Sequence, residues 1–178
     1  MASAFSHALA AAAMGSFYSA KQFGWRSWVL GMLCAILPDA DVISFSLGIP
    51  YEHVLGHRGF THSFLFALIW GWIVCELFFR KVPRGSKTWW MLCGYFFLCT
   101  ASHAVLDALT NGGLGVAFFA PFDNSRYFFP WRPVQVSPIG VENFFSEWGW
   151  RVIKSELFYL ALPSLVIGLM GWFWQKFK

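Results

Sequence analysis

The chain has 178 residues, of which 57% are apolar, 21% aromatic and only 12% charged. A soluble domain carries about a quarter charged residues, so this composition excludes an ordinary soluble domain as well as a disordered chain, a coiled coil or a disulfide scaffold. It predicts an all-α integral membrane protein, with the lipid bilayer as its main partner. The net charge of +4 does not indicate nucleic-acid binding, because the basic residues form short clusters between apolar runs.

Five apolar runs predict a bundle of about five transmembrane helices, at residues 2–20, 25–47, 61–79, 88–109 and 156–173. Spans of about 17–25 residues cross a hydrocarbon core of about 30 Å. The first run has no basic stretch before it, so it is expected to be a retained helix rather than a signal peptide. The Gly-, Pro- and Trp-rich residues 110–155 predict a long outer segment without a clean helix. No internal repeat is visible, so residues 1–178 form one predicted domain.

The basic residues predict the orientation of the chain. They lie between the first and second runs, between the third and fourth, and after the fifth, at Lys21, Arg26, Arg80, Lys81, Arg84, Lys87, Lys176 and Lys178. Five crossings place these clusters on one side, which the positive-inside rule makes cytoplasmic. The N-terminus is then outside and the C-terminus inside.

Histidine and aspartate side chains gather toward the opposite, outer ends of the same runs. They are His7, Asp39, Asp41, His53, His57, His62, His103 and Asp107. His103 and Asp107 are four residues apart, so they share one helical face at about 6 Å. Imidazole and carboxylate together suit Zn²⁺, Mn²⁺ or Fe²⁺ better than Ca²⁺ or Mg²⁺.

A metal ion explains this cluster better than interhelical hydrogen bonding alone. A carboxylate at membrane depth costs about 2.5–3.5 kcal/mol, and only Arg58 is available to neutralise one of three aspartates. One or two divalent ions, zinc as the first choice, are therefore predicted. The predicted ligands are Asp39 or Asp41 or both, together with His62, His103 and Asp107. His7 and His57 are predicted as additional ligands or as supports of the ligands. His53 is expected to be a solvated surface residue. For Arg126 and Arg132, anchoring at the membrane interface and recognition of phosphate are equally favoured.

The sequence resembles a known family, the membrane-bound predicted metal-dependent hydrolases of bacteria and archaea, or YdjM-like inner-membrane proteins. The resemblance covers about residues 6–140 and rests on Ser6-His7-Ala8, Pro38-Asp39-Ala40-Asp41, Gly56-His57-Arg58-Gly59-Phe60-Thr61-His62-Ser63, Ser102-His103-Ala104-Val105-Leu106-Asp107, Leu109-Thr110-Asn111-Gly112-Gly113 and Ala120-Pro121-Phe122. A more distant similarity links the order of His and Asp residues to zinc-dependent phospholipase C and P1-type nucleases. This chain has no histidine after His103, which favours one or two ions over three.

The residues and the resemblance together imply a hydrolase of the bacterial or archaeal inner membrane with its site facing outward. A metal-activated water would attack a phosphoester of a lipid or lipid-linked substrate, with Asp41 and His57 assisting proton transfer and Arg58 clamping a phosphate oxygen. A transporter and a scaffold with a structural metal remain the alternatives. The sequence leaves the oligomeric state open.

Overall fold

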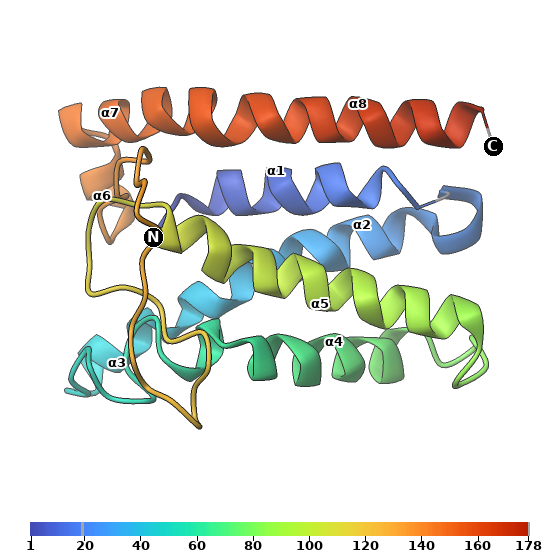
Figure 1. The fold of residues 1–178 in the computed structure, drawn as a ribbon, viewed down its shortest axis with the longest axis horizontal. Helices are drawn as coiled ribbons and strands as arrows, with labels where there is room; N and C mark the ends of the chain where they lie inside the picture. Colours follow the sequence, from blue (N-terminus) through green and yellow to red (C-terminus); the bar gives the residue numbers. More distant parts are fainter. Residues whose placement is uncertain (19, 178) are drawn as a thin grey trace.

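The computed structural model describes residues 1–18 and 20–177 and is all-helical. Its longer helices run side by side along the longest axis of the molecule (Figure 1). They are α1 (Ala4–Gly15), α2 (Ala20–Ile36), α4 (Phe64–Phe78), α5 (Lys87–Ala108), α7 (Glu147–Glu156) and α8 (Leu162–Lys176). The shorter elements are the helices α3 (Ile43–Ser46) and α6 (Val141–Phe144), the 3₁₀-helices η1 (Leu37–Val42) and η2 (Phe60–His62), and the π-helix η3 (Leu157–Ala161).

Within the described residues, three continuous helical stretches are long and apolar enough to cross a membrane: Gly24–Ser46, Lys87–Ala108 and Glu147–Lys176. The helices α1 and α4, which match the first and third predicted spans, are apolar but have only 12 and 15 residues. The all-helical architecture with several candidate spans is therefore confirmed. A bundle of five crossing helices stays a prediction.

The expectation that residues 110–155 lack a clean helix was wrong for the last part of this segment. Residues 141–144 form α6, and α7 begins at Glu147, well before the predicted start of the last span. Ser146 caps this helix because its Oγ accepts a hydrogen bond from the backbone N–H of Gly149, and Glu147 places an acidic side chain in the first turn. The helix therefore begins at Glu147 even though Gly and Trp residues, which favour helix less, surround this position.

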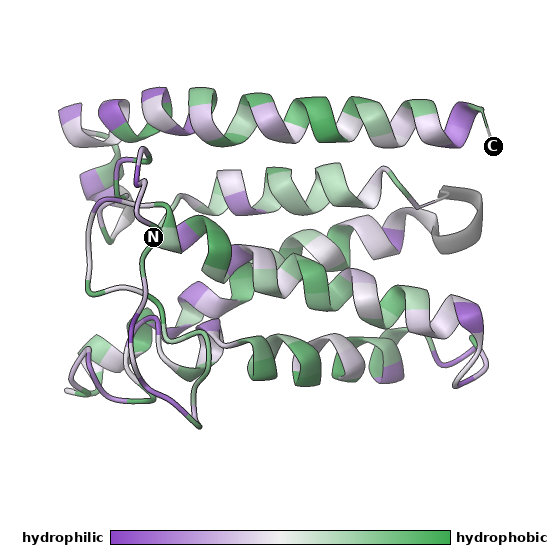
Figure 2. Ribbon diagram, viewed as in Figure 1, coloured by the Kyte–Doolittle hydropathy of each residue, from purple (hydrophilic) through white to green (hydrophobic). Residues whose placement is uncertain are grey.

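The two ends of the bundle differ in chemistry. The N-terminus, α3 and the long segment after α5 lie at one end, and the C-terminus and the α4–α5 connection lie at the other (Figure 1). Figure 2 shows apolar residues along the middle of α4 and α8 and hydrophilic residues toward the ends. The α4–α5 connection and the end of α8 carry Arg80, Lys81, Arg84 and Lys176, whereas the His and Asp residues lie at the opposite end. The side chain of Lys21 and all of Lys178 fall outside the described part of the chain.

The core forms where α5 packs against α2 and α4, around Tyr95, Phe96 and four free, buried cysteines. These cysteines act as small apolar side chains of the core. Close approach of α4 to α5 depends on Gly71, because a Cβ added there would lie 2.8 Å from the backbone nitrogen of Phe97. A Cβ added at Gly94, on α5, would meet no described atom within 4 Å outside the adjacent backbone of its own helix.

We expect Gly71→Ala to destabilise the protein by about 1–3 kcal/mol, because the backbone of α5 must move to admit the methyl group. The matched variant Gly94→Ala should be neutral or stabilising by up to about 1 kcal/mol, since alanine favours helix without a clash. Thermal unfolding of both variants in detergent measures the difference. Equal melting temperatures would mean that the two helices are not in close contact.

Candidate metal centre

Four buried side chains bring one ligand atom each within 4.8 Å of one another at the N-terminal end of the bundle: Asp39, His62, His103 and Asp107. They come from three elements, since η1 carries Asp39, η2 carries His62, and α5 carries the other two. The predicted pairing of His103 with Asp107 on one face of α5 is present: Nε2 of His103 lies 3.9 Å from Oδ2 of Asp107.

Local backbone features aim these residues at one point. Pro38 stands at the start of η1, where its missing N–H costs no hydrogen bond. The turn before η2 is tightly packed, since a Cβ at Gly56 would lie 2.3 Å from the carbonyl oxygen of Pro50, and one at Gly59 would lie 2.2 Å from that of Val54. Arg58 between them has a φ of 60°, the left-handed region that non-glycine residues seldom adopt.

Hydrogen bonds at the far side of each imidazole leave its inner nitrogen free to bind a metal. Nδ1 of His103 lies 2.7 Å from the carbonyl oxygen of Ala35, which only accepts, so this nitrogen carries the proton. Nδ1 of His62 lies 3.1 Å from Oδ2 of Asp41 and donates in the same way. The two Nε2 atoms face each other at 3.0 Å. A partner that holds the outer nitrogen of a histidine in this way is a regular feature of metal sites.

Unpartnered polar atoms at the centre of the cluster also fit a cation. Both carboxylate oxygens of Asp39 and both ring nitrogens of His7 are buried without a hydrogen-bond partner, and Oδ2 of Asp107 accepts no hydrogen bond. Buried polar atoms are rarely left in this state, because desolvation without a partner costs free energy. The donor set of two imidazoles and two carboxylates matches the ligands that Zn²⁺ takes in proteins.

His7 lies against the four-residue cluster. Its ring stacks on that of His103, with centroids 3.8 Å apart, and its Nε2 is 3.5 Å from Oδ1 of Asp107. The first turn of α1 therefore places His7 against the cluster, and its role as a further ligand or a support stays a prediction.

The structure separates the two aspartates that the sequence treated alike. Asp39 points to the cluster, with Oδ1 3.3 Å from Nε2 of His103. Asp41 lies behind His62 and joins it to His57, whose Nδ1 is 2.6 Å from Oδ1 of Asp41. Thr61 and the backbone N–H of Arg58 donate to its Oδ2, at 2.6 and 3.0 Å. Asp41 thus holds the two histidines in fixed orientations.

Arg58 is fully buried and is the charge partner of Asp107. Its Nε lies 2.9 Å from Oδ2 of Asp107, while Nη1 donates to the carbonyl of Gly112 and Nη2 to Thr110 Oγ1. The amino group of Met1 is a second cationic neighbour of Asp107, with its nitrogen 3.9 Å from Oδ2. The three carboxylates of Asp39, Asp41 and Asp107 still outnumber these two cationic groups when the histidines are neutral, so a bound cation would offset the remaining negative charge.

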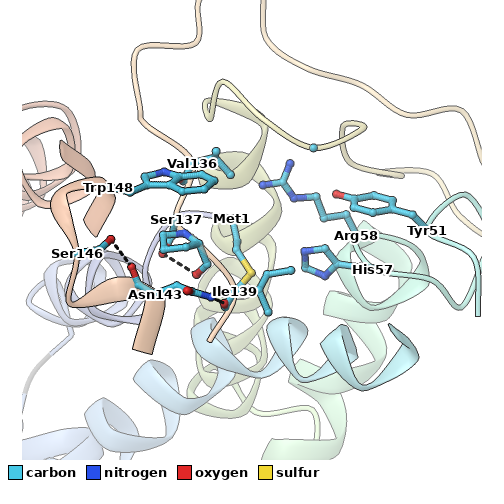
Figure 3. A pocket seen from close by; sticks show the side chains of 12 residues that line it. Met1, Tyr51, His57, Arg58, Val136, Ser137, Ile139, Asn143, Ser146 and Trp148 are labelled. Atoms are coloured by element: carbon cyan, nitrogen blue, oxygen red, sulfur yellow. Dashed lines mark hydrogen bonds between the residues drawn. The ribbon is translucent and has the colours of Figure 1, made fainter. Parts of the chain in front are cut away.

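A cavity of about 460 Å³ is lined by His57 and Arg58, which contact Asp41 and Asp107, and not by the four clustered residues themselves. In Figure 3, Tyr51, His57 and Arg58 lie on one side and Trp148, Asn143 and Ser146 on the other, with Met1 between them. Burial raises the pKa of Tyr51, so its hydroxyl keeps its proton at neutral pH. The wall thus combines a histidine, a phenol and apolar surface.

The remaining predicted polar residues serve the surroundings of the centre. His53 is exposed, as expected. Arg126 braces the loop before η2 by donating to the backbone carbonyls of His57 and Tyr51, and burial lowers its pKa. Arg132 is exposed and stacks on Phe128. The sequence reasoning assigned no role to Glu156, which is buried against the start of α1. The position of Glu156 at the start of the last apolar run was the sequence signal that could have identified it.

Comparison with known proteins adds a family to this geometry. Residues 1–177 match the family described as YdjM inner membrane protein. The inner membrane protein YbcI of Escherichia coli K12 is 35% identical over 177 residues, covering 99% of both chains. The inner membrane protein YdjM of the same organism is 34% identical over 104 residues, covering 51% of this chain and 47% of its own. No solved structure matches the chain.

Proposed function

The chain belongs to the YdjM family of inner membrane proteins, and from its buried His/Asp centre we propose that it is a membrane-bound, metal-dependent hydrolase. The single observation that carries the proposal is the convergence of Asp39, His62, His103 and Asp107 on one point beside a cavity. Buried ionisable groups at membrane depth mark functional sites by default, because their desolvation is costly.

We propose Zn²⁺, as one ion or two, held by these four residues with His7 as a further ligand. When bound, the ion supplies Lewis acidity that polarises the scissile group and activates a water molecule. His57 lines the cavity, and its Nδ1 contacts Asp41, so its outer nitrogen is set to exchange a proton with a bound substrate. Arg58 acts in this scheme through Asp107 rather than by direct contact with a phosphate oxygen.

The proposed substrate is a lipid or a lipid-linked phosphoester. Val136, Ile139 and Trp148 give the cavity apolar surface, with Trp148 across from His57 and Arg58 (Figure 3). An amphiphile matches this pairing of apolar and polar surfaces.

We further propose that the centre faces the extracytoplasmic side, across five spans. Reporter fusions after Arg84 and after Lys178 are then expected to behave as cytoplasmic, and a fusion near Asn124 as external, because basic loops stay inside. A cytoplasmic signal at Asn124 would place the centre in the cytosol instead.

The proposed activity predicts at least one equivalent of tightly held transition metal in detergent-purified protein, with hydrolysis of a phosphodiester or phosphomonoester. Elemental analysis measures the first, and a chromogenic substrate screen in mixed micelles measures the second. Chelation should abolish turnover, and zinc should restore it. Turnover that survives complete metal removal would contradict the proposal.

A structural metal is the second candidate, because four protein ligands are enough to close a tetrahedral zinc site. This reading is favoured by the near-complete burial of all four side chains. It predicts that chelation lowers the melting temperature while no phosphoester is turned over.

A further inference from the structure

Glu156, the last residue of α7, has a buried carboxylate outside the centre. It precedes η3 within the helical stretch Glu147–Lys176, and only 5% of the residue is exposed. No ion pair found among the described residues involves it. A charge in this position needs strong hydrogen bonds to offset its desolvation.

The start of α1 supplies those hydrogen bonds. The Glu156 carboxylate accepts from the backbone N–H and Oγ of Ser3, both at 2.5 Å, and from Oγ of Ser6 at 2.8 Å. Ser3 is the N-cap of α1, so the carboxylate also lies at the positive end of that helix dipole. The contact therefore satisfies Glu156 and fixes the position of α1.

A second carboxylate holds the neighbouring residue. The backbone N–H of Ala2 donates to Oδ1 of Asp107 at 2.7 Å, so Asp107 on α5 and Glu156 on α7 bind consecutive peptide groups. The start of α1 is therefore hydrogen-bonded to both α5 and α7. His7 follows one turn later, and its backbone N–H donates to the carbonyl of Ser3 at 3.2 Å.

We propose that Glu156 is a positioning residue of the metal centre, which sets metal affinity by fixing the start of α1 and thereby the ring of His7. The inference rests on the proposed function only in requiring that the centre binds a metal. Glu156 itself is not among the four clustered ligand residues.

The test is the zinc dissociation constant of the full chain in detergent, measured by competition with a chromogenic chelator. Glu156→Ala is expected to weaken zinc binding about 10–100-fold, the loss typical when a support of a metal ligand is removed. Ser6→Ala, which removes one of the three contacts, should give a smaller loss in the same direction. Glu147→Ala is the matched control, because this glutamate lies on the same helix with its side chain 96% exposed.

A double-mutant cycle with His7→Ala separates positioning from general destabilisation. If Glu156 acts through His7, Glu156→Ala should change zinc affinity less than about threefold in the His7→Ala background, since both variants remove one interaction. An equal loss in both backgrounds would overturn the proposal, as would unchanged affinity in Glu156→Ala. If Glu156→Ala does not fold, Ser3→Ala and Ser6→Ala carry the same cycle. Failure of the wild-type protein to bind zinc would instead contradict the metal-dependent function as well.

Discussion

Replacement of His103 by alanine is expected to abolish stoichiometric zinc binding and hydrolysis together. His103 presents Nε2 to the centre while the carbonyl of Ala35 holds its Nδ1, so its imidazole is oriented to bind a metal. Loss of an outer support of a metal ligand already weakens binding about 10–100-fold, and loss of a ligand should exceed that. Elemental analysis of purified protein and zinc-dependent thermal shift measure the effect. At a zinc concentration 100 times the wild-type dissociation constant, the wild type should gain about 2.7 kcal/mol that the variant lacks.

His53→Ala is the matched control, because it removes the same side-chain type from an exposed position. It should retain the metal, the thermal shift and any hydrolytic activity of the wild type. One equivalent of zinc bound by His103→Ala with unchanged affinity would exclude His103 as a ligand. Retention in the double variant His103→Ala with Asp107→Ala would exclude the centre as a whole.

Arg58→Met is expected to lower the free energy of unfolding by about 3–5 kcal/mol, because it leaves the buried charge of Asp107 without its guanidinium partner. Methionine approximates the length of the arginine stem, so little packing is lost. The unfolding should be measured in chelator and again with excess zinc. Zinc should stabilise Arg58→Met more than the wild type, because the cation then becomes the main counter-charge of Asp107.

Arg132→Met is the control for this variant, since Arg132 is exposed. Its unfolding free energy should stay within about 0.5 kcal/mol of the wild type. The opposite result at Arg58, unchanged stability and metal content with a loss of turnover, would show that Arg58 contacts the substrate phosphate as first expected from the sequence. The buried ion pair and the two further hydrogen bonds of Arg58 favour the effect on stability.

The sequence predicted the helical class and much of the centre because hydropathy and side-chain chemistry are local properties. The i,i+4 spacing placed His103 and Asp107 on one face of α5. The gathering of the His and Asp residues at the end opposite the basic residues followed from the alternation of the predicted spans.

Other features depend on distant partners and were not visible in the pattern. Asp39 and Asp41 are both acids in one short motif, and only the packing of η1 against η2 decides which faces the cluster. The direction of Arg58 depends on the carbonyl of Gly112, far along the chain. The early start of α7 was signalled by Ser146 and Glu147, but the surrounding Gly and Trp residues obscured it.

The wide separation of the four clustered residues along the chain has a consequence for biosynthesis. Asp39 lies in an earlier candidate span than His103 and Asp107, so an insertion intermediate would carry the Asp39 carboxylate before its partners on α5 have entered the bilayer. A metal at the proposed centre could be acquired only after α5 has joined the bundle. Metal loading would then be a late step in maturation, and scarcity of the ion would leave an inserted but incompletely stabilised chain exposed to quality-control proteases.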